Sequence, residues 1–269
     1  MFEPLDACEA RVPGNGSLVQ RTVVAFLAYL GRLVYLHSYV LSLIARRRVE
    51  GQLAVSQMAT IGVASLPIAA VTTLLSGMVI GYHFAVQAGQ YGMSGYAGWL
   101  VAETMCRELG PVLVAFVVAA RAGSAMTAEL GTMKATEQID ALRAMATDPI
   151  EYLVVPRYIG TVLMLPLLAF VGDFVGVMGG WVMAVIAPQI NESVYFAAIA
   201  SRLEAWTIIA GLLKTIVFGM IISLVACHEG ICCRPASEEV GRATTRAVVY
   251  CIMLVYAADV ALTAMLYPG

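Results

Sequence analysis

The stretch that decides the fold is Gly51–Ala102, GQLAVSQMATIGVASLPIAAVTTLLSGMVIGYHFAVQAGQYGMSGYAGWLVA. It contains no Asp, Glu, Lys or Arg over 52 residues. About 20 apolar residues are enough to cross a bilayer as a helix. This stretch is therefore long enough to cross more than once, and it predicts an all-α polytopic membrane protein.

The composition of the whole chain points the same way. Of its 269 residues, 60% are hydrophobic and 13% are charged, and the mean hydropathy is +0.83. Soluble domains carry about 25% charged residues, so a water-soluble enzyme is excluded. The net charge of −2 indicates no nucleic-acid partner, because such proteins concentrate positive charge on one face.

Apolar stretches of sufficient length predict five membrane spans. We place these spans over Ala59–Ala88, Tyr96–Ala120, Leu153–Ala187, Ala205–Cys227 and Ala247–Leu266.

A further apolar segment, Leu18–Ala45, is interrupted by Arg21, Arg32 and His37 and is followed by three arginines at 46–48. Such polar interruptions favour a helix that lies in the membrane interface. The chain thus divides into an N-terminal tail with an interfacial helix (1–50) and a five-span domain (51–269).

Basic residues indicate the orientation of the spans. If the arginines at 46–48 are cytoplasmic, the N-terminal region and the inside loops hold 13 of the 16 basic residues: Arg11, Arg21, Arg32, Arg46, Arg47, Arg48, Arg121, Lys134, Arg143, Arg157, Arg234, Arg242 and Arg246. The N-terminus is then inside and the C-terminus outside. Acidic residues precede the first apolar run, which argues against a cleaved signal or transit peptide and favours a bacterial inner membrane.

Two connections are long enough to fold. Inside, Thr127–Pro149 has apolar residues at roughly helical spacing, which predicts one amphipathic helix on the cytoplasmic surface. We expect Asp148-Pro149 to end it, since the residue before a proline resists helical geometry. Outside, Gln189–Glu204 predicts a second short amphipathic helix.

Charged residues inside the spans are informative because each costs at least ~2.5–3.5 kcal/mol near the bilayer centre unless it is paired. These residues are Glu103, Arg107, Glu108, Asp173, Lys214 and Asp259. Glu103 and Arg107 are four residues apart and can pair on one helix face, and Lys214 could pair with Glu108 or Asp259. Such pairs would either fix helix register or act as a latch that rearranges during transport.

Glycines repeat every four residues on two predicted spans, at Gly77 and Gly81 and at Gly172, Gly176 and Gly180. Small residues at this interval let helix backbones approach closely. We predict helix packing there, within or between subunits.

Enzymatic interpretations find little support. The sequence contains no Gly-x-x-x-x-Gly-Lys-Ser/Thr loop for nucleotide binding. Cys227, His228, Cys232 and Cys233 match no zinc spacing, so no metal site is predicted. Ser94, in Gly92-Met93-Ser94-Gly95, could suggest an intramembrane protease, but no base is evident beside it, and a turn is favoured.

Several further motifs stand out: ELGP at 108–111, AARAGS at 119–124, AELGTM at 128–133, TEQIDAL at 136–142, TDP at 147–149 and GRATTRAVV at 241–249, followed by Asp259. Together they resemble the MlaE/YrbE permease family, the membrane subunits of ABC transporters that move phospholipids with MCE-domain proteins. The likeness runs from about residue 20 to the C-terminus. The sequence around Cys232-Cys233-Arg234-Pro235 departs from the family pattern.

The resemblance implies a permease subunit with no cofactor of its own, whose partner ATPase binds ATP and Mg²⁺. The implied partners are a second copy of the chain, a cytoplasmic ABC ATPase, an MCE-domain lipid-binding protein, a small cytoplasmic STAS-type subunit and phospholipid. Thr127–Pro149 would be the coupling helix, and its implied ATPase contacts are Glu129, Met133, Lys134, Glu137, Asp140 and Leu142.

The resemblance also implies a lipid held between the first and second spans of two subunits. The residues it places near the lipid are Ile80, Phe84, Gln87, Ala88, Tyr91, Val101 and Leu109. Arg107, Glu108, Lys214 and Asp259 match a charged network of the family, for which we predict a role in coupling. Transport direction and lipid identity are not implied.

Other function classes stay open at this point. An ion-coupled secondary transporter would use the intramembrane charges as its ion path, although five spans without an inverted repeat count against it. A scaffold that only anchors the MCE ring would share every feature above except transport.

Overall fold

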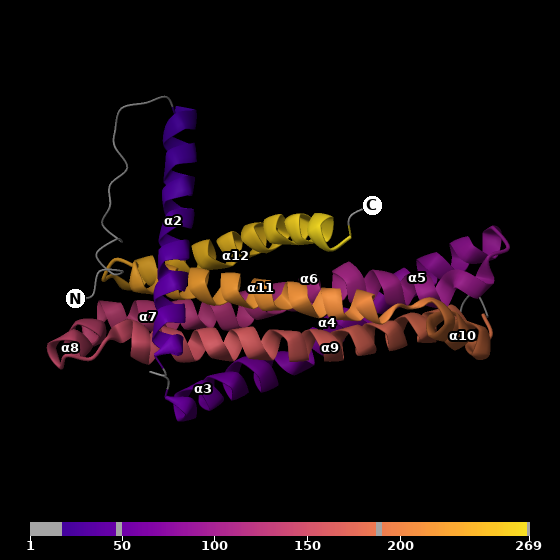
Figure 1. Cartoon of the computed structure of the whole chain (residues 1–269), viewed down its shortest axis with the longest axis horizontal. Coiled ribbons are helices and arrows are strands. Elements are labelled where there is room, and N and C mark those ends of the chain that lie inside the picture. The colour runs from indigo at the N-terminus through magenta and orange to yellow at the C-terminus, as the bar shows by residue number, and fades with distance from the viewer. Residues whose placement is uncertain (1–17, 47–49, 187–189, 268–269) are drawn as a thin grey trace.

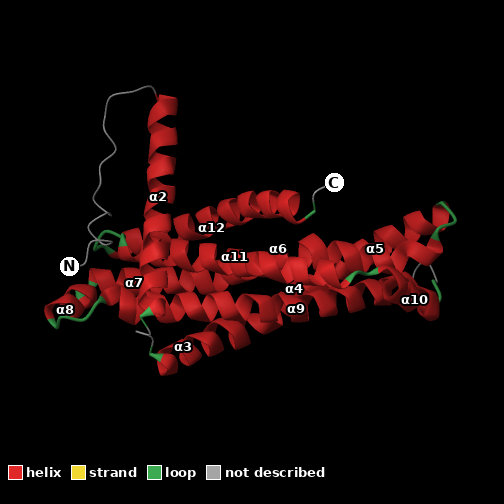
Figure 2. Ribbon diagram, viewed as in Figure 1, coloured by secondary structure: helices red, strands yellow, loops and turns green. Residues whose placement is uncertain are grey.

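The computed structural model describes residues 18–46, 50–186 and 190–267, and within those ranges every regular element is a helix (Figure 2). Six helices there are long and apolar enough to cross a membrane: Gln20–Ala45, Gly51–Gln90, Ser94–Ala135, Ile150–Ile186, Ala205–Ile231 and Ser237–Leu266. The prediction of an all-α polytopic membrane protein is confirmed. The predicted tail, Arg11, Arg47, Arg48, Ala187 and Gln189 lie outside the described residues.

The long helices are assembled from shorter elements in chain order. These are α2 (Leu18–Ala45), α3 (Gly51–Met58), α4 (Ala64–Gln90), α5 (Ala97–Thr104), α6 (Gly110–Val118), α7 (Ser124–Ala135), α8 (Gln138–Ala144), α9 (Val155–Ile186), α10 (Glu192–Arg202), α11 (Ala205–Ile231) and α12 (Ser237–Leu266). The bundle is elongated, with α8 at one end and α10 at the other (Figure 1).

Four π-helical turns interrupt these helices: η2 (Ala59–Val63), η4 (Met105–Leu109), η5 (Ala119–Gly123) and η6 (Ile150–Val154). Two of them lie in the second span, between α5 and α6 and between α6 and α7. A π-turn shifts the helix register by one residue and is frequent at functional sites.

The predicted N-terminal helix is present over Leu18–Ala45. It crosses α11 and α12, whereas the other long helices run along the bundle (Figure 1). One face is anchored by the buried side chains of Leu33, Leu36, Val40 and Leu43. Its placement in the membrane interface stays a prediction.

The helix that carries the second predicted span continues past Ala120 and runs from Ser94 to Ala135. The charged residues that seemed to end it find partners on other helices. Arg121 Nη1 donates to the Thr60 carbonyl oxygen at 3.0 Å and to Ser65 Oγ at 3.2 Å. The helix therefore continues through Arg121, the charge that we used to predict the end of the span.

The prediction of one helix over Thr127–Pro149 is wrong. Helix α7 ends at Ala135, Glu137 takes a left-handed conformation with φ of 60°, and α8 is a separate seven-residue helix. Asp148-Pro149 does not end a helix but starts one, because the Asp148 carboxylate accepts a hydrogen bond from the Ile150 N–H at 2.9 Å. An aspartate that caps a helix start satisfies an otherwise unpaired backbone donor.

At the opposite end the predicted short helix is present as α10, and Asn191 caps it by accepting from the Ser193 N–H at 2.9 Å. Tyr195 on α10 is fully buried, and its hydroxyl donates to the Val177 carbonyl oxygen on α9 at 3.1 Å. The predicted turn at Gly92-Met93-Ser94-Gly95, between α4 and α5, is also present, with Gly92 at a positive φ of 67°.

Close packing of α4 against α9 forms the centre of the fold. A Cβ atom built on Gly77 would overlap the backbone of Gly176, and one built on Gly81 would overlap the backbone of Gly180. The predicted glycine packing is thus confirmed, and it lies within one chain.

This packing generates a stability prediction. Gly77→Ala should lower the thermal unfolding temperature in detergent, because overpacking of a close helix contact costs about 1–3 kcal/mol. The matched control is Gly89→Ala on the same helix, where a Cβ would meet nothing within 4 Å. Equal melting temperatures for the two variants would contradict the packing argument.

Candidate functional site

A buried lysine lies at the centre of the candidate site. The Lys214 side chain is 0% exposed, and its Nζ lies 2.6 Å from Glu108 Oε2 and 3.0 Å from Asp259 Oδ1. It also donates to Thr263 Oγ1 at 2.7 Å. We call Arg107, Glu108, Lys214, Asp259 and Thr263 the Lys214 cluster. It joins the second span to α11 and α12.

The backbone of the second span is shaped for this lysine. Pro111 has no N–H, so the carbonyl oxygen of Arg107, four residues earlier, lacks its α-helical donor. Lys214 Nζ donates to that oxygen at 3.3 Å. Both Arg107 and Glu108 lie within the π-turn η4, so the irregular backbone and the ion pair occur at the same place.

Arg107 lies at the more exposed edge of the cluster. Its Nη1 is 3.4 Å from Glu103 Oε1, which confirms the predicted pair one turn apart, and its Nε is 3.8 Å from Glu108 Oε1. The guanidinium carbon also lies 3.5 Å from the centroid of the Tyr267 ring, a cation–π geometry. Thr207 on α11 donates to Glu103 at 3.2 Å.

The sequence predicted Glu108 or Asp259 as the partner of Lys214, and the structure gives it both. Thr263 was not predicted, although it follows Asp259 by four residues and so lies on the same helix face. Thr263 Oγ1 donates in turn to Glu108 Oε1 at 3.2 Å. An ammonium has three protons, and here four acceptors surround it. Lys214 can therefore change partners if the helices shift.

Asp173 lies apart from this cluster. Its side chain is 4% exposed, and neither carboxylate oxygen has a hydrogen-bond partner among the described residues. It contacts Gly110, where any Cβ would overlap Asp173 Oδ1. The structure thus does not bring Asp173 together with the other intramembrane charges.

The residues predicted to line a lipid cavity lie between the Lys214 cluster and the α10 end. Five of them belong to one apolar cluster: Ile80, Phe84, Ala88, Val101 and Leu109. Val101 is 0% exposed in the single chain, whereas Gln87 and Tyr91 are exposed, Tyr91 by 79%. The exposed pair and the apolar cluster border the same turns of α4. Their contact with lipid stays a prediction.

The residues predicted to contact an ATPase lie at the α8 end. Glu129, Met133 and Lys134 are on α7, Asp140 and Leu142 are on α8, and Glu137 is in the bend between them. The two sides of the bend are joined by an ion pair between Lys134 of α7 and Asp140 of α8 at 3.1 Å, and Asp140 also pairs with Arg143 on its own helix at 3.1 Å. The six residues thus gather on one compact knob.

A shallow hollow of about 510 Å³ opens beside this knob. It is lined by Ala128, Glu129, Thr132, Met133 and Arg157. Arg157 Nη2 lies 3.0 Å from Glu129 Oε2 and ties α9 to α7. An inserted side chain from another protein would meet both apolar and charged groups there.

The Cys227–Cys233 region lies near the same end. Cys227 and Cys233 are buried, and Glu229 lies 3.2 Å from Arg246 and 3.6 Å from His228. Within the described ranges no group of three or more His, Cys, Asp and Glu residues could hold a metal ion.

Comparison with known proteins identifies the family of the chain. The Permease MlaE family matches residues 54–265, which cover the five predicted spans up to residue 265 and do not include α2. The chain belongs to the MlaE permease family. The motif-based resemblance is confirmed.

Three relatives of this MlaE-family chain match it over nearly its whole length. A probable ABC transporter permease protein of Rickettsia typhi is 36% identical over 251 residues, which cover 93% of this chain and 97% of the relative. A probable ABC transporter permease protein of Synechocystis is 37% identical, with 93% and 92% covered. The intermembrane phospholipid transport system permease protein MlaE of Haemophilus influenzae is 34% identical, with 93% and 97% covered. This chain is therefore an ABC transporter permease.

The Lys214 cluster generates a second prediction. Lys214→Met should destabilise the protein by about 3–5 kcal/mol, because it leaves the mostly buried Asp259 carboxylate without a cation and leaves Glu108 with only the more distant Arg107. The triple variant Lys214→Met/Glu108→Gln/Asp259→Asn should recover most of this loss, since no charge is then left unpaired. Thermal unfolding in detergent, followed by size-exclusion chromatography, measures both. A triple variant less stable than Lys214→Met would contradict the ion-pair argument.

Proposed function

We propose that this chain is the membrane subunit of an ABC transporter that moves phospholipid or a related lipid. A separate ATPase subunit would supply the energy, and an MCE-domain protein in the periplasm would exchange lipid with the membrane. The observation that carries the proposal is the end-to-end similarity to the phospholipid transport permease of Haemophilus influenzae.

The need for a separate ATPase subunit is inferred from the sequence. It contains no glycine-rich Walker A loop, so ATP and Mg²⁺ would be bound by another polypeptide. A small cytoplasmic STAS-type subunit would complete the cytoplasmic part of the complex. Two copies of this chain would form the transmembrane pathway.

We place the chain in a bacterial inner membrane, with the N-terminus cytoplasmic and the C-terminus periplasmic. The α8 end would then be cytoplasmic, because Lys134, Arg143, Arg157, Arg242 and Arg246 lie on or beside it. Residues 1–50 would form the N-terminal tail and interfacial helix, and residues 51–269 the permease domain.

The mechanism we propose begins at the knob formed by α7 and α8. The ATPase would dock there, beside the hollow next to Glu129 and Met133. Because the helix is continuous from Ser94 to Ala135, a push at its cytoplasmic end reaches the π-turn η4. The Lys214 cluster would respond as a latch, exchanging partners as the second span moves against α11 and α12.

The lipid would be held nearer the α10 end, between the first and second spans of two subunits. The apolar cluster that includes Phe84 and Leu109 suits an acyl chain, and the exposed Gln87 and Tyr91 suit a headgroup. Closing this space would pass the lipid to or from the MCE-domain protein.

An ion-coupled secondary transporter is the second candidate, and the buried Lys214 cluster is the observation that favours it. Paired intramembrane charges can form an ion path. The two candidates differ in energy source: lipid movement by the permease needs ATP, whereas movement by a secondary transporter needs an ion gradient.

The proposal is tested by affinity purification from native membranes in mild detergent. We expect mass spectrometry to find an ATPase, an MCE-domain protein and phospholipid, and we expect the eluate to hydrolyse ATP. Recovery of the chain alone, without ATP turnover, would overturn the proposal and favour the ion-coupled candidate.

A pair of variants sharpens this experiment. Glu137→Lys, in the bend between α7 and α8, should lose the ATPase from the eluate. Glu192→Lys, in the first turn of α10 at the far end of the bundle, should retain it. Loss of the ATPase from both variants, or from neither, would contradict docking at the knob.

The latch role predicts a separable loss of coupling. The triple variant Lys214→Met/Glu108→Gln/Asp259→Asn should still assemble and hydrolyse ATP but should move lipid about tenfold more slowly, a factor within the usual range of coupling free energies. Lipid transfer between proteoliposomes and acceptor vesicles measures this. Intact assembly and transport in both Lys214→Ala and Asp259→Ala would exclude the latch.

A further inference from the structure

Helix α2 is fastened to the bundle along only one part of its length. From Tyr29 onward one face packs on the bundle: the Tyr29 ring lies 5.0 Å from the Tyr250 ring of α12, centroid to centroid, and the side chains from Leu33 on are buried. The Tyr39 hydroxyl donates to Asp148 Oδ2 at 2.7 Å. Its earlier turns expose large apolar side chains, among them Phe26 and Leu27. The helix therefore acts as a wall that stands across α11 and α12 (Figure 1).

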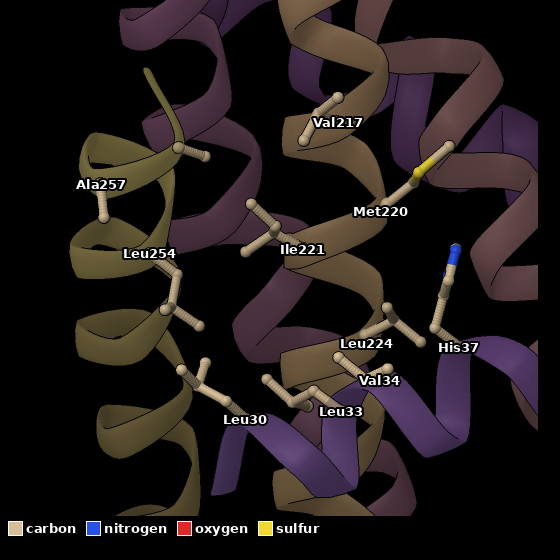
Figure 3. A pocket seen from close by; sticks show the side chains of 11 residues that line it. Leu30, Leu33, Val34, His37, Val217, Met220, Ile221, Leu224, Leu254 and Ala257 are labelled. Carbon is tan, nitrogen blue, oxygen red and sulfur yellow. The ribbon is translucent and has the colours of Figure 1, made fainter. Parts of the chain in front are cut away.

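An apolar cavity of about 440 Å³ lies where this wall meets the bundle. Its lining comes from three helices: Leu30, Leu33, Val34 and His37 of α2, Val217, Met220, Ile221 and Leu224 of α11, and Leu254, Ala257 and Ala258 of α12. Figure 3 shows α11 and α12 side by side with α2 across them. The volume is in the range of small-ligand sites, about 300–1,000 Å³.

His37 is the only ionisable residue in this lining, and its ring faces a partner outside the cavity. Its Nδ1 lies 3.3 Å from the Tyr158 hydroxyl of α9. The other lining side chains are aliphatic or thioether. A long apolar chain is the chemistry that such a surface accommodates.

A second hollow, of about 380 Å³, adjoins the first at Leu254. Its lining adds polar groups from Thr22, Tyr29, Arg32 and Tyr250. The Arg32 guanidinium carbon lies 6.0 Å from the centroid of the Tyr29 ring. A guanidinium presents several N–H donors in one plane and matches the oxygens of a phosphate.

The two hollows follow each other along α12 in a fixed order. The hollow with Arg32 borders Tyr250 to Leu254, and the apolar cavity borders Leu254 to Ala258. The apolar cavity ends beside Asp259, whose carboxylate binds Lys214. A cationic end joined to an apolar end is complementary to one amphiphile with a negatively charged headgroup.

We infer that the hollows between α2, α11 and α12 bind one anionic phospholipid, with its phosphate at Arg32 and an acyl chain along the apolar cavity. This site is separate from the lipid path near Phe84 and Tyr91. It goes beyond the proposed function, because it needs neither transport nor an ATPase. The family match begins at residue 54, so the α2 wall of the site lies outside it.

The test uses the full-length chain in phosphatidylcholine nanodiscs with a trace of photoactivatable lipid. The probe is phosphatidylglycerol or phosphatidylcholine with a diazirine in one acyl chain. After illumination, mass spectrometry maps the crosslinked peptides. We expect phosphatidylglycerol to label Val217–Leu224 and Leu254–Ala258 about tenfold more than phosphatidylcholine does. Both lipids carry the phosphate, but only phosphatidylglycerol has a net negative charge, because the choline ammonium of phosphatidylcholine offsets its phosphate and repels the Arg32 guanidinium.

Two pairs of variants decide the interpretation. Ala257→Phe, which fills the apolar cavity, should abolish this labelling, whereas Ala261→Phe, one turn further along the exposed face of α12, should leave it unchanged. Arg32→Gln should remove the preference for phosphatidylglycerol, and Arg21→Gln should retain it. Melting temperatures of all four variants check that each is folded.

Three results would overturn the inference. Equal labelling by the two lipids in the wild type would indicate annular lipid only. Unchanged labelling in Ala257→Phe would place the acyl chain elsewhere. A shift of Ala257→Phe from dimer to monomer on size-exclusion chromatography, with lipid labelling retained, would make the cavity a contact between copies. Failure of ATP-driven transport leaves the test unaffected, so the two proposals fail independently.

Discussion

The constraint on which the rest of the structure depends is the burial of one ammonium group. Lys214 has no exposed surface, and the low dielectric of a membrane bundle makes an unpaired charge there very costly. Satisfying it requires Glu108 from the second span and Asp259 and Thr263 from α12. Three spans are therefore fixed in register by one side chain, and any movement of the second span must either carry these partners along or exchange them.

The second span is built to allow such movement without breaking. Two π-turns and Pro111 leave its backbone less regular than that of α11, and Lys214 compensates for the donor that Pro111 cannot supply. By contrast, α4 and α9 are locked by glycines whose backbones touch. The helices α4 and α9 therefore form a rigid pair, whereas the second span is held to α11 and α12 by ion pairs. Ion pairs can exchange partners when helices move, and close backbone packing cannot.

This division suits a permease driven from outside the chain. The knob of α7 and α8 lies at one end of the continuous second span, the Lys214 cluster lies in its middle, and the apolar cluster with Phe84 lies toward the other end. In the proposed mechanism, a force applied at the knob would be carried along a single helix past the charges to the place where lipid would be held. The hollows beside α2 lie off this line, between α2, α11 and α12.

The sequence by itself determined the all-α membrane fold, the spans to within a few turns, the glycine packing and the partners of Lys214, because hydropathy, periodicity and the cost of a buried charge act locally or pairwise. It did not predict that the helix of the second span continues past Ala120, where Arg121 is satisfied by residues distant in the chain. It also misjudged the shape of 127–149, where Glu137 turns the backbone. Only the tertiary structure decided that Asp173 lies apart from the other charges, that Thr263 is a further partner of Lys214, and that α2 borders an apolar hollow beside α11 and α12. Each of these depends on how helices cross, and crossing geometry is set by the packing of the whole bundle rather than by any one segment.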